Sequence, residues 1–346
     1  MSPVADIALV SLGTTPGLVR SDDAFASLVR RAGASCEVVP VQIGSSGRLR
    51  RHPAVTDLVE ALAARRSARG LRARAVVYST ITAALLQRPE APYGVRFDAI
   101  AALNRPGAAG LWQRRRERPV LDGAAILMPV SRGAAAAVQG ETPPTVRVPI
   151  PIEEIDGAAE RDVDAVAYAG YPRKRGLELL CAAWAEAAPP GARLVVGGTD
   201  REKGTAWLRR TGVPEPDGVE WAGVLPRERW LDLVRRTRLF LNASHWEDFG
   251  IAPMEALAAG TPLVTVPTPG SFEALSLARE LAPDLVAVDV SVDSLAVAIR
   301  AGFALDDERR RRYGERALEL LRPYREEAIG RIVAERVLPA LGIGAA

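Results

Sequence analysis

The chain has 346 residues, of which 48% are hydrophobic and 25% are charged. This composition excludes a long disordered chain and favours one or two globular domains. Its apolar runs are strand-sized, far below the roughly 18 to 20 residues that a membrane span needs. The start lacks the basic region of a secretory signal, and Cys36 and Cys181 form neither a disulfide framework nor a metal-ligand pair. We therefore expect a cytoplasmic protein.

The charge is distributed unevenly around a net value of +3. Residues 1–150 contain 20 Lys and Arg against 11 Asp and Glu, a net of +9, whereas the remainder has 25 against 31, a net of −6. Two interpretations stay open: solvated Arg-rich helices, or an anionic partner such as a phosphorylated acceptor or a membrane that the protein contacts peripherally. No zinc-ligand spacing or aromatic RNA-binding motif accompanies the arginines, so nucleic acid is the least favoured partner.

Strand and helix signals alternate in the first half, as in a parallel α/β sheet. Strands are predicted over 6–12, 37–41, 75–78 and 126–130. Ser21 is predicted to cap a first helix that ends over 31–33, and an amphipathic helix is predicted over 55–64. Four prolines then crowd residues 143–151, where we place the interdomain linker, because proline removes backbone donors.

The alternation restarts after the linker. Strands are predicted over 165–169, 193–196, 219–222, 239–242 and 263–266. Helices are predicted over 177–187, 227–236 and 252–259, and a last charged helix from Asp306 past Leu321. We expect two Rossmann-like doubly wound domains, over 1–147 and 148–322, with residues 323–346 forming a helix that packs back on the first domain.

The most informative stretch is Asn242–Pro269, where a strand ends in a polar loop and a helix follows. Gly250 permits close approach of backbone to a ligand, and the free N–H groups of the following helix suit a diphosphate. Glu255, expected in the first turn, can accept hydrogen bonds from ribose hydroxyls. Glu247 lies eight residues earlier, on the loop over the same helix end.

The segment Glu247-Asp-Phe-Gly-Ile-Ala-Pro-Met-Glu255 closely resembles the Glu-x7-Glu motif of retaining glycosyltransferases of family 4, which have the GT-B fold of two domains facing across a cleft. The resemblance extends over about 148–320. Ala167-Tyr-Ala-Gly-Tyr-Pro-Arg-Lys-Arg-Gly176 is similar to the family's basic phosphate-binding loop. Two further segments, 195–199 and 221–226, are similar to strand ends that flank the nucleotide base.

The resemblance implies a role for each matching residue. Glu247 would bind hydroxyls of the transferred sugar as the catalytic residue, and Glu255 would bind the ribose. The remaining donor-site residues would be, for the nucleotide and phosphates, Arg173, Lys174, Arg175, Gly13, Gly198 and Ile251, and for the sugar, Asp248, Phe249 and Gly250. Tyr171 stands where the family usually has an arginine, so Arg173 or Lys174 would supply the missing charge.

The family likeness implies a retaining transferase that moves a hexose from a UDP-, GDP- or ADP-sugar to a small-molecule, glycan or lipid acceptor. It implies no cofactor and no metal, because basic residues and helix dipoles replace a cation. Two alternatives stay open: a catalytically degenerate GT-B protein that only binds a sugar nucleotide, and a sugar-nucleotide epimerase of the same fold. The chain has only two histidines, His52 and His245, which disfavours the acid–base chemistry of the epimerase.

Overall fold

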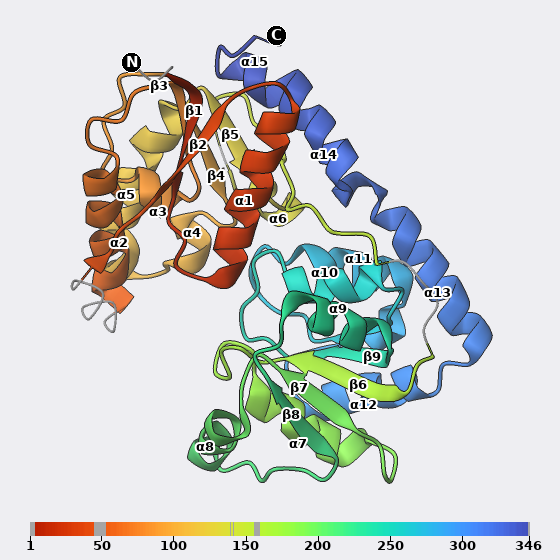
Figure 1. Ribbon diagram of the computed structural model, residues 1–346. Helices are drawn as coiled ribbons and strands as arrows, with labels where there is room; N and C mark the ends of the chain where they lie inside the picture. The colour runs from red at the N-terminus through yellow and green to blue at the C-terminus, as the bar shows by residue number, and fades with distance from the viewer. Residues whose placement is uncertain (1–3, 45–52, 139, 141, 156–159, 345–346) are drawn as a thin grey trace. The chain divides into compact units, whose positions relative to one another are not determined.

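A computed structural model describes residues 4–44, 53–138, 140, 142–155 and 160–344. The chain divides into two compact units, one comprising Met1–Pro151 with Tyr324–Ala346 and the other Ile152–Pro323 (Figure 1). His52 lies outside the described residues. Among the described helices, none is both long and apolar enough to cross a bilayer.

The first unit is built on a five-stranded parallel sheet with the order β2-β1-β3-β4-β5 (Figure 1). Its strands are β1 (Ala5–Ser11), β2 (Cys36–Pro40), β3 (Ala73–Tyr78), β4 (Tyr93–Phe97) and β5 (Ile126–Pro129). Its helices are α1 (Pro16–Arg31), α2 (Pro53–Ser67), α3 (Ile81–Ala84), α4 (Ala101–Asn104), α5 (Leu111–Asp122) and α6 (Arg132–Ala137). Strands β1, β3, β4 and β5 are mostly buried and apolar because helices pack on both faces of the sheet, whereas the edge strand β2 is largely accessible.

The C-terminal segment completes the core of the first unit. It consists of α14 (Glu326–Ile332), a π-helical turn (Val333–Val337) and α15 (Leu338–Ala340). Ile329 and Val333 are fully buried in the same apolar cluster as Ile7 and Phe25. The last residues of the chain therefore stabilise the first unit by removing apolar surface from water.

The second unit is built on a parallel sheet with the order β10-β9-β6-β7-β8. Its strands are β6 (Val163–Tyr168), β7 (Leu194–Gly197), β8 (Val219–Gly223), β9 (Thr237–Asn242) and β10 (Leu263–Thr265). Its helices are α7 (Leu177–Ala187), α8 (Arg201–Thr211), α9 (Arg227–Arg235), α10 (Ile251–Ala258), α11 (Glu273–Leu281), α12 (Val292–Phe303) and α13 (Asp307–Leu320). The prediction of parallel α/β sheets is confirmed in both halves.

The predicted start of the first helix is wrong. Ser21 lies inside α1 and is buried, whereas Thr15 caps the helix by accepting a hydrogen bond from the Leu18 N–H at 3.2 Å. Pro16 directly after that cap has the backbone angle of a first helical turn, which makes this start the more stable one. Both cysteines are buried free thiols, as expected.

Candidate active site

The candidate site lies at the carboxyl ends of β6 and β9, which are neighbours in the sheet. The chain runs from β6 to β7 and β8 on one side, and β9 and β10 lie on the other. Strand order therefore reverses between β6 and β9. In open α/β sheets this reversal point leaves a crevice outside the strand ends, where ligands bind.

The loop after β6 approaches the loop after β9 through a glycine. Gly176 precedes α7 with φ 58°, and a Cβ there would lie 2.0 Å from the Ala243 carbonyl oxygen. The His245 N–H donates to the Lys174 carbonyl at 2.9 Å and joins the two loops. Only glycine fits at this position. Because Arg175 directly precedes Gly176, it lies beside the loop that follows β9.

Arg175 and Glu247 form an ion pair between these loops. The Arg175 Nη1 atom donates to Glu247 Oε2, and Glu247 is 4% exposed. The Arg175 guanidinium also lies over the Tyr168 ring, 5.6 Å from its centroid. Burial lowers the pKa of Arg175, an effect that nearby Tyr168 and Asp248 oppose. Glu247, predicted as the catalytic carboxylate, and Arg175, predicted as a phosphate-binding cation, are therefore ion-pair partners.

The residues between Glu247 and α10 have distinct positions. Asp248 accepts from Trp246 Nε1 at 2.7 Å and lies 3.4 Å from Lys174 Nζ, whereas Phe249 is buried. Gly250 precedes α10 with φ 80°, and Ile251 is its first residue. A Cβ on Gly250 would lie 2.4 Å from the Phe272 ring, so this helix start also requires glycine.

Two helix N-termini meet this site without a side-chain cap. Both α7 and α10 begin after a glycine in the left-handed conformation, and glycine has no side-chain oxygen that could cap a helix. The Leu177 N–H at the start of α7 already donates to the Pro172 carbonyl at 3.1 Å, so the N–H groups available to a ligand are the next ones of α7 and the first two of α10, where the helix dipoles favour an anion. By contrast, Thr15, Ser131 and Asp306 cap other helices with their side-chain oxygens.

Glu255 is 2% exposed and is held at both carboxylate oxygens. Arg227 Nη1 donates to Oε1 at 2.5 Å, and Trp230 Nε1 donates to Oε2 at 2.7 Å. The expected place in the first turn is wrong, because α10 starts at Ile251 and Glu255 is its fifth residue. A carboxylate has about four acceptor positions, so acceptor capacity for hydroxyl donors remains.

Arg227 and Trp230 are the site residues that the sequence analysis missed. They lie three apart on α9 and so share one helix face. Arg227 also donates to Glu153 at 3.1 Å, and its Nε is buried with no hydrogen-bond partner in the described residues. The available signal was Pro226, which precedes α9 directly and follows the end of the predicted strand 219–222 by four residues.

The other predicted phosphate-binding residues are not all assembled with the Glu247 pair. Arg173 is exposed and its side chain makes no hydrogen bond or ion pair within the described part of the chain, and Tyr171 is 69% exposed. Gly198 belongs to the edge of the site, because a Cβ there would lie 2.7 Å from the Gly170 nitrogen. Gly13 belongs to the first unit, where it lines a hollow of about 490 Å³ after β1.

The described residues contain no cluster of three or more His, Cys, Asp or Glu side chains that could hold a metal ion. The polar groups at the carboxyl ends of β6 and β9 are instead arginines, carboxylates and helix N–H groups. This set can bind an anion next to a group rich in hydroxyls.

Comparisons with known proteins concern the family and the fold of the chain. Residues 152–320 match the family model described as glycosyl transferases group 1. A 63-residue segment is 38% identical to mannosylfructose-phosphate synthase of Agrobacterium fabrum and spans 18% of this chain but only 14% of that protein.

Solved structures extend the likeness to nearly the whole chain. Sucrose-phosphate synthase from Thermosynechococcus elongatus has a TM-score of 0.74 at 16% identity, with 97% of this chain and 99% of that one covered. HepE of Anabaena, in complex with UDP and glucose, has a TM-score of 0.67 at 15% identity, with 96% and 99% covered. The predicted GT-B fold is confirmed.

Proposed function

Because residues 152–320 match the family model of glycosyl transferases group 1, we propose that this chain is a retaining glycosyltransferase that moves a hexose from a nucleoside diphosphate sugar to an acceptor. The observation that carries the proposal is the Arg175–Glu247 pair beside two uncapped helix N-termini at the sheet's switch point. HepE of Anabaena was solved with UDP and glucose, which makes UDP the first nucleotide to test.

Each residue has a distinct task in this mechanism. Departure of the nucleoside diphosphate places negative charge on the phosphates, which Arg175 and the N–H groups of α7 and α10 stabilise. Glu247 accepts hydrogen bonds from sugar hydroxyls, and Glu255 from the ribose. The acceptor hydroxyl attacks the anomeric carbon on the face that the phosphate leaves, and the departing phosphate takes its proton. The two buried carboxylates therefore position the donor, and the reaction requires no metal.

The test is calorimetry with UDP, GDP, ADP and TDP and their common sugars, followed by turnover assays with and without excess EDTA. A ligand that binds only the native state raises stability by about 2.7 kcal/mol at a hundredfold excess over its dissociation constant. We expect one nucleotide to bind selectively, Glu255→Ala to lose that binding and EDTA to leave turnover unchanged. Glu319→Ala is the control, because Glu319 is an exposed residue of α13 whose ion pair, within the described residues, is with Arg316.

One observation favours a second candidate function, binding without transfer. Tyr171 replaces the arginine that the resembling family usually carries after Gly170, and it is 69% exposed. Selective nucleotide binding combined with no release of nucleoside diphosphate from any sugar nucleotide would support this candidate. Failure of every nucleotide to bind the folded protein would refute both candidates.

A further inference from the structure

A polar cavity lies in the second unit, at the amino ends of β6 and β9. Its volume is about 910 Å³, which is the size of a site for a small molecule. Its floor is close-packed backbone, because the Cα of Gly314 in α13 would lie 3.1 Å from a Cβ on Gly260. The candidate active site begins at Gly250, at the opposite end of α10, so the two sites are separate.

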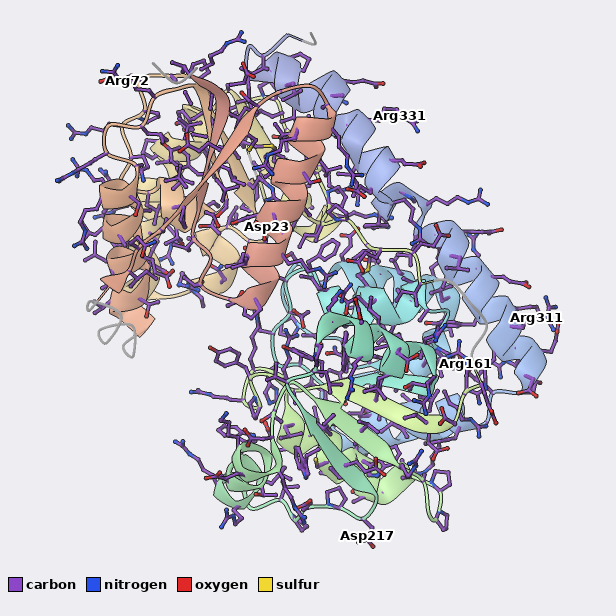
Figure 2. All side chains as sticks on the ribbon, viewed as in Figure 1. Asp23, Arg72, Arg161, Asp217, Arg311 and Arg331 are labelled. Atoms are coloured by element: carbon purple, nitrogen blue, oxygen red, sulfur yellow. The ribbon has the colours of Figure 1, made fainter. Side chains whose placement is uncertain are left out.

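Arginines dominate the lining of this cavity. Five arginines face two carboxylates, Glu154 and Asp307. The five are Arg161, Arg235, Arg238, Arg310 and Arg311. Figure 2 labels two of them, Arg161 and Arg311, which come from elements far apart in the sequence. The lining alone therefore carries three net positive charges.

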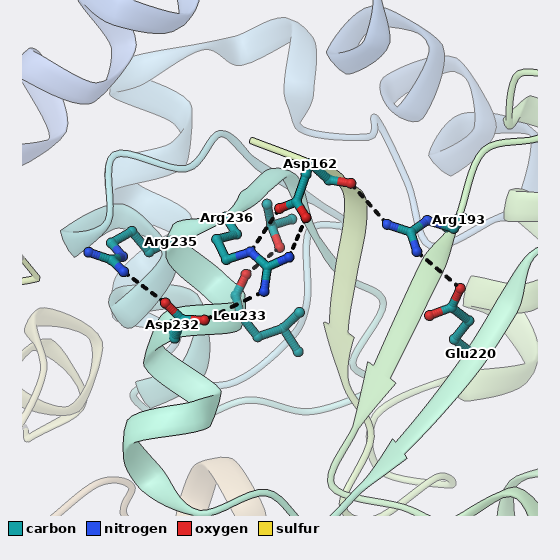
Figure 3. A network of polar contacts seen from close by, with 8 residues as sticks. Asp162, Arg193, Glu220, Asp232, Leu233, Arg235 and Arg236 are labelled. Atoms are coloured by element: carbon teal, nitrogen blue, oxygen red, sulfur yellow. Dashed lines mark hydrogen bonds and ion pairs between the residues drawn. The ribbon is translucent and has the colours of Figure 1, made fainter. Parts of the chain in front are cut away.

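Several arginines near the same end of the sheet form ion pairs with neighbouring acidic residues. Figure 3 shows Arg235 donating to Asp232 at 2.8 Å and Arg236 donating to Asp162 at 2.8 Å. Arg193 in the same network lies 3.5 Å from Glu220. Arg311 likewise pairs with acidic residues of its own helix. Local pairing of arginine with acid is thus the rule around this cavity.

Three arginines that line the cavity form no hydrogen bond to an acidic residue within the described part of the chain. Arg161 is held by neutral oxygens, those of Thr237, Thr261, Ala259 and Gly260. Arg310 donates to the backbone carbonyls of Arg238 and Leu305 at 3.1 and 2.9 Å. Within the described part of the chain, Arg238 donates no side-chain hydrogen bond, although it lies on β9, next to the central strand β6.

The positive charges in the cavity repel one another. Burial lowers the pKa of Arg161, and the charge of Arg310 lowers it further. Burial and the charge of Arg238 likewise lower the pKa of Arg310, which Asp306 and Asp307 only partly offset. An anion among these groups would relieve the repulsion, and its bonds to guanidinium would be charge-assisted.

We propose that this cavity is a binding site for a phosphate-bearing small molecule, with Arg238 as the direct ligand and Arg161 and Arg310 supplying the surrounding positive field. Phosphate is the chemistry that fits, because guanidinium groups offer paired planar donors to its oxygens. The volume admits a diphosphate or a phosphorylated sugar, in addition to free phosphate. The site is distinct from the nucleotide-sugar site and does not depend on the proposed transferase activity.

The test is a calorimetric titration of the full chain with inorganic pyrophosphate at low salt. We expect Arg238→Gln to weaken binding at least tenfold and Arg238→Lys to restore part of it. The matched control is Arg312→Gln, because Arg312 lies on α13 outside the cavity and pairs with Glu308 on its own helix. Arg175→Gln removes the candidate active-site cation and should leave the titration unchanged.

Three outcomes would overturn the proposal. They are an absence of pyrophosphate binding to the folded wild type, equal binding to wild type and Arg238→Gln, and loss of binding in Arg175→Gln alone. The last outcome would assign the anion to the carboxyl end of the sheet. Partial rescue by Arg238→Lys separates a binding role of Arg238 from a role in folding, since lysine restores the charge on the same strand.

Discussion

Replacing Glu255 with alanine should destabilise the second unit as well as abolish nucleotide binding. The carboxylate is 2% exposed and accepts from Arg227 at 2.5 Å and from Trp230 at 2.7 Å. Its removal leaves the Trp230 indole N–H without its acceptor and takes away one of the two carboxylates that Arg227 contacts, Glu153 being the other. The buried Arg227 Nε has no hydrogen-bond partner within the described residues, so the guanidinium depends on its two carboxylate contacts.

The size of the effect follows from these two bonds. Hydrogen bonds to charged groups contribute about 1.5–3 kcal/mol each, and loss of one partner of a buried ion pair costs about 3–5 kcal/mol. Arg227 is 30% exposed, so water compensates part of its loss. We therefore expect Glu255→Ala to lower the free energy of unfolding by about 3 kcal/mol.

Urea unfolding, followed by tryptophan fluorescence and circular dichroism, measures this change. The surface control Glu319→Ala should cost about 0–1 kcal/mol, because exposed ion pairs contribute little. Trp230→Phe retains a ring against Tyr168 and removes the N–H, so it should lose about 1 kcal/mol and keep nucleotide affinity. This variant separates the structural role of Glu255 from its ligand role.

A double-mutant cycle between Glu255→Ala and Arg227→Met measures the coupling free energy of this pair. The two side chains are in direct contact, so their coupling should be about 1–3 kcal/mol. A coupling near zero, or a Glu255→Ala variant as stable as Glu319→Ala, would refute the inference that Arg227 and Trp230 hold this carboxylate.

Two further predictions concern other carboxylates. Glu247→Ala should reduce turnover strongly while largely sparing nucleotide affinity, because Glu247 is paired with Arg175 and is assigned to the sugar. An equal loss of turnover and of nucleotide affinity would contradict that assignment. Burial raises the pKa of Glu117 to about 7, so the folded state keeps a proton that the unfolded state releases above pH 4.5, and stability falls as pH rises towards 7. Glu117→Gln should therefore raise the free energy of unfolding by about 3 kcal/mol at pH 8 and hardly change it at pH 4.5, and an equal effect at both pH values would contradict this.

The strands and the carboxylate motif were predictable because their signals are local. The apolar runs predicted nine of the ten strands found in the described residues, and helix α7 has the predicted bounds. Strand β4 escaped prediction because Arg96 interrupts its apolar run. That arginine is 2% exposed and pairs with Asp22 at 3.1 Å, from 74 residues away. Only tertiary folding could reveal that a buried charge belongs in this strand.

The same limit applied at the candidate active site. The spacing of Glu247 and Glu255 lies within one loop and one helix, so the sequence could show it. The partners of Glu255 come from 25 and 28 residues earlier, on a helix whose orientation the sheet decides. A sequence motif therefore identified the carboxylates, whereas the cations and donors around them required the fold.

The arginines at the two ends of the second sheet differ in whether they have an acidic partner. At the carboxyl end, Arg175 already has a carboxylate partner, so an anion must compete with Glu247. A complete sugar nucleotide overcomes that competition, because its hydroxyls can satisfy Glu247 while its phosphates take Arg175. At the amino end, no described acid hydrogen-bonds to Arg161, Arg238 or Arg310, so a bare phosphate needs no such exchange. This difference is why pyrophosphate discriminates between the two sites.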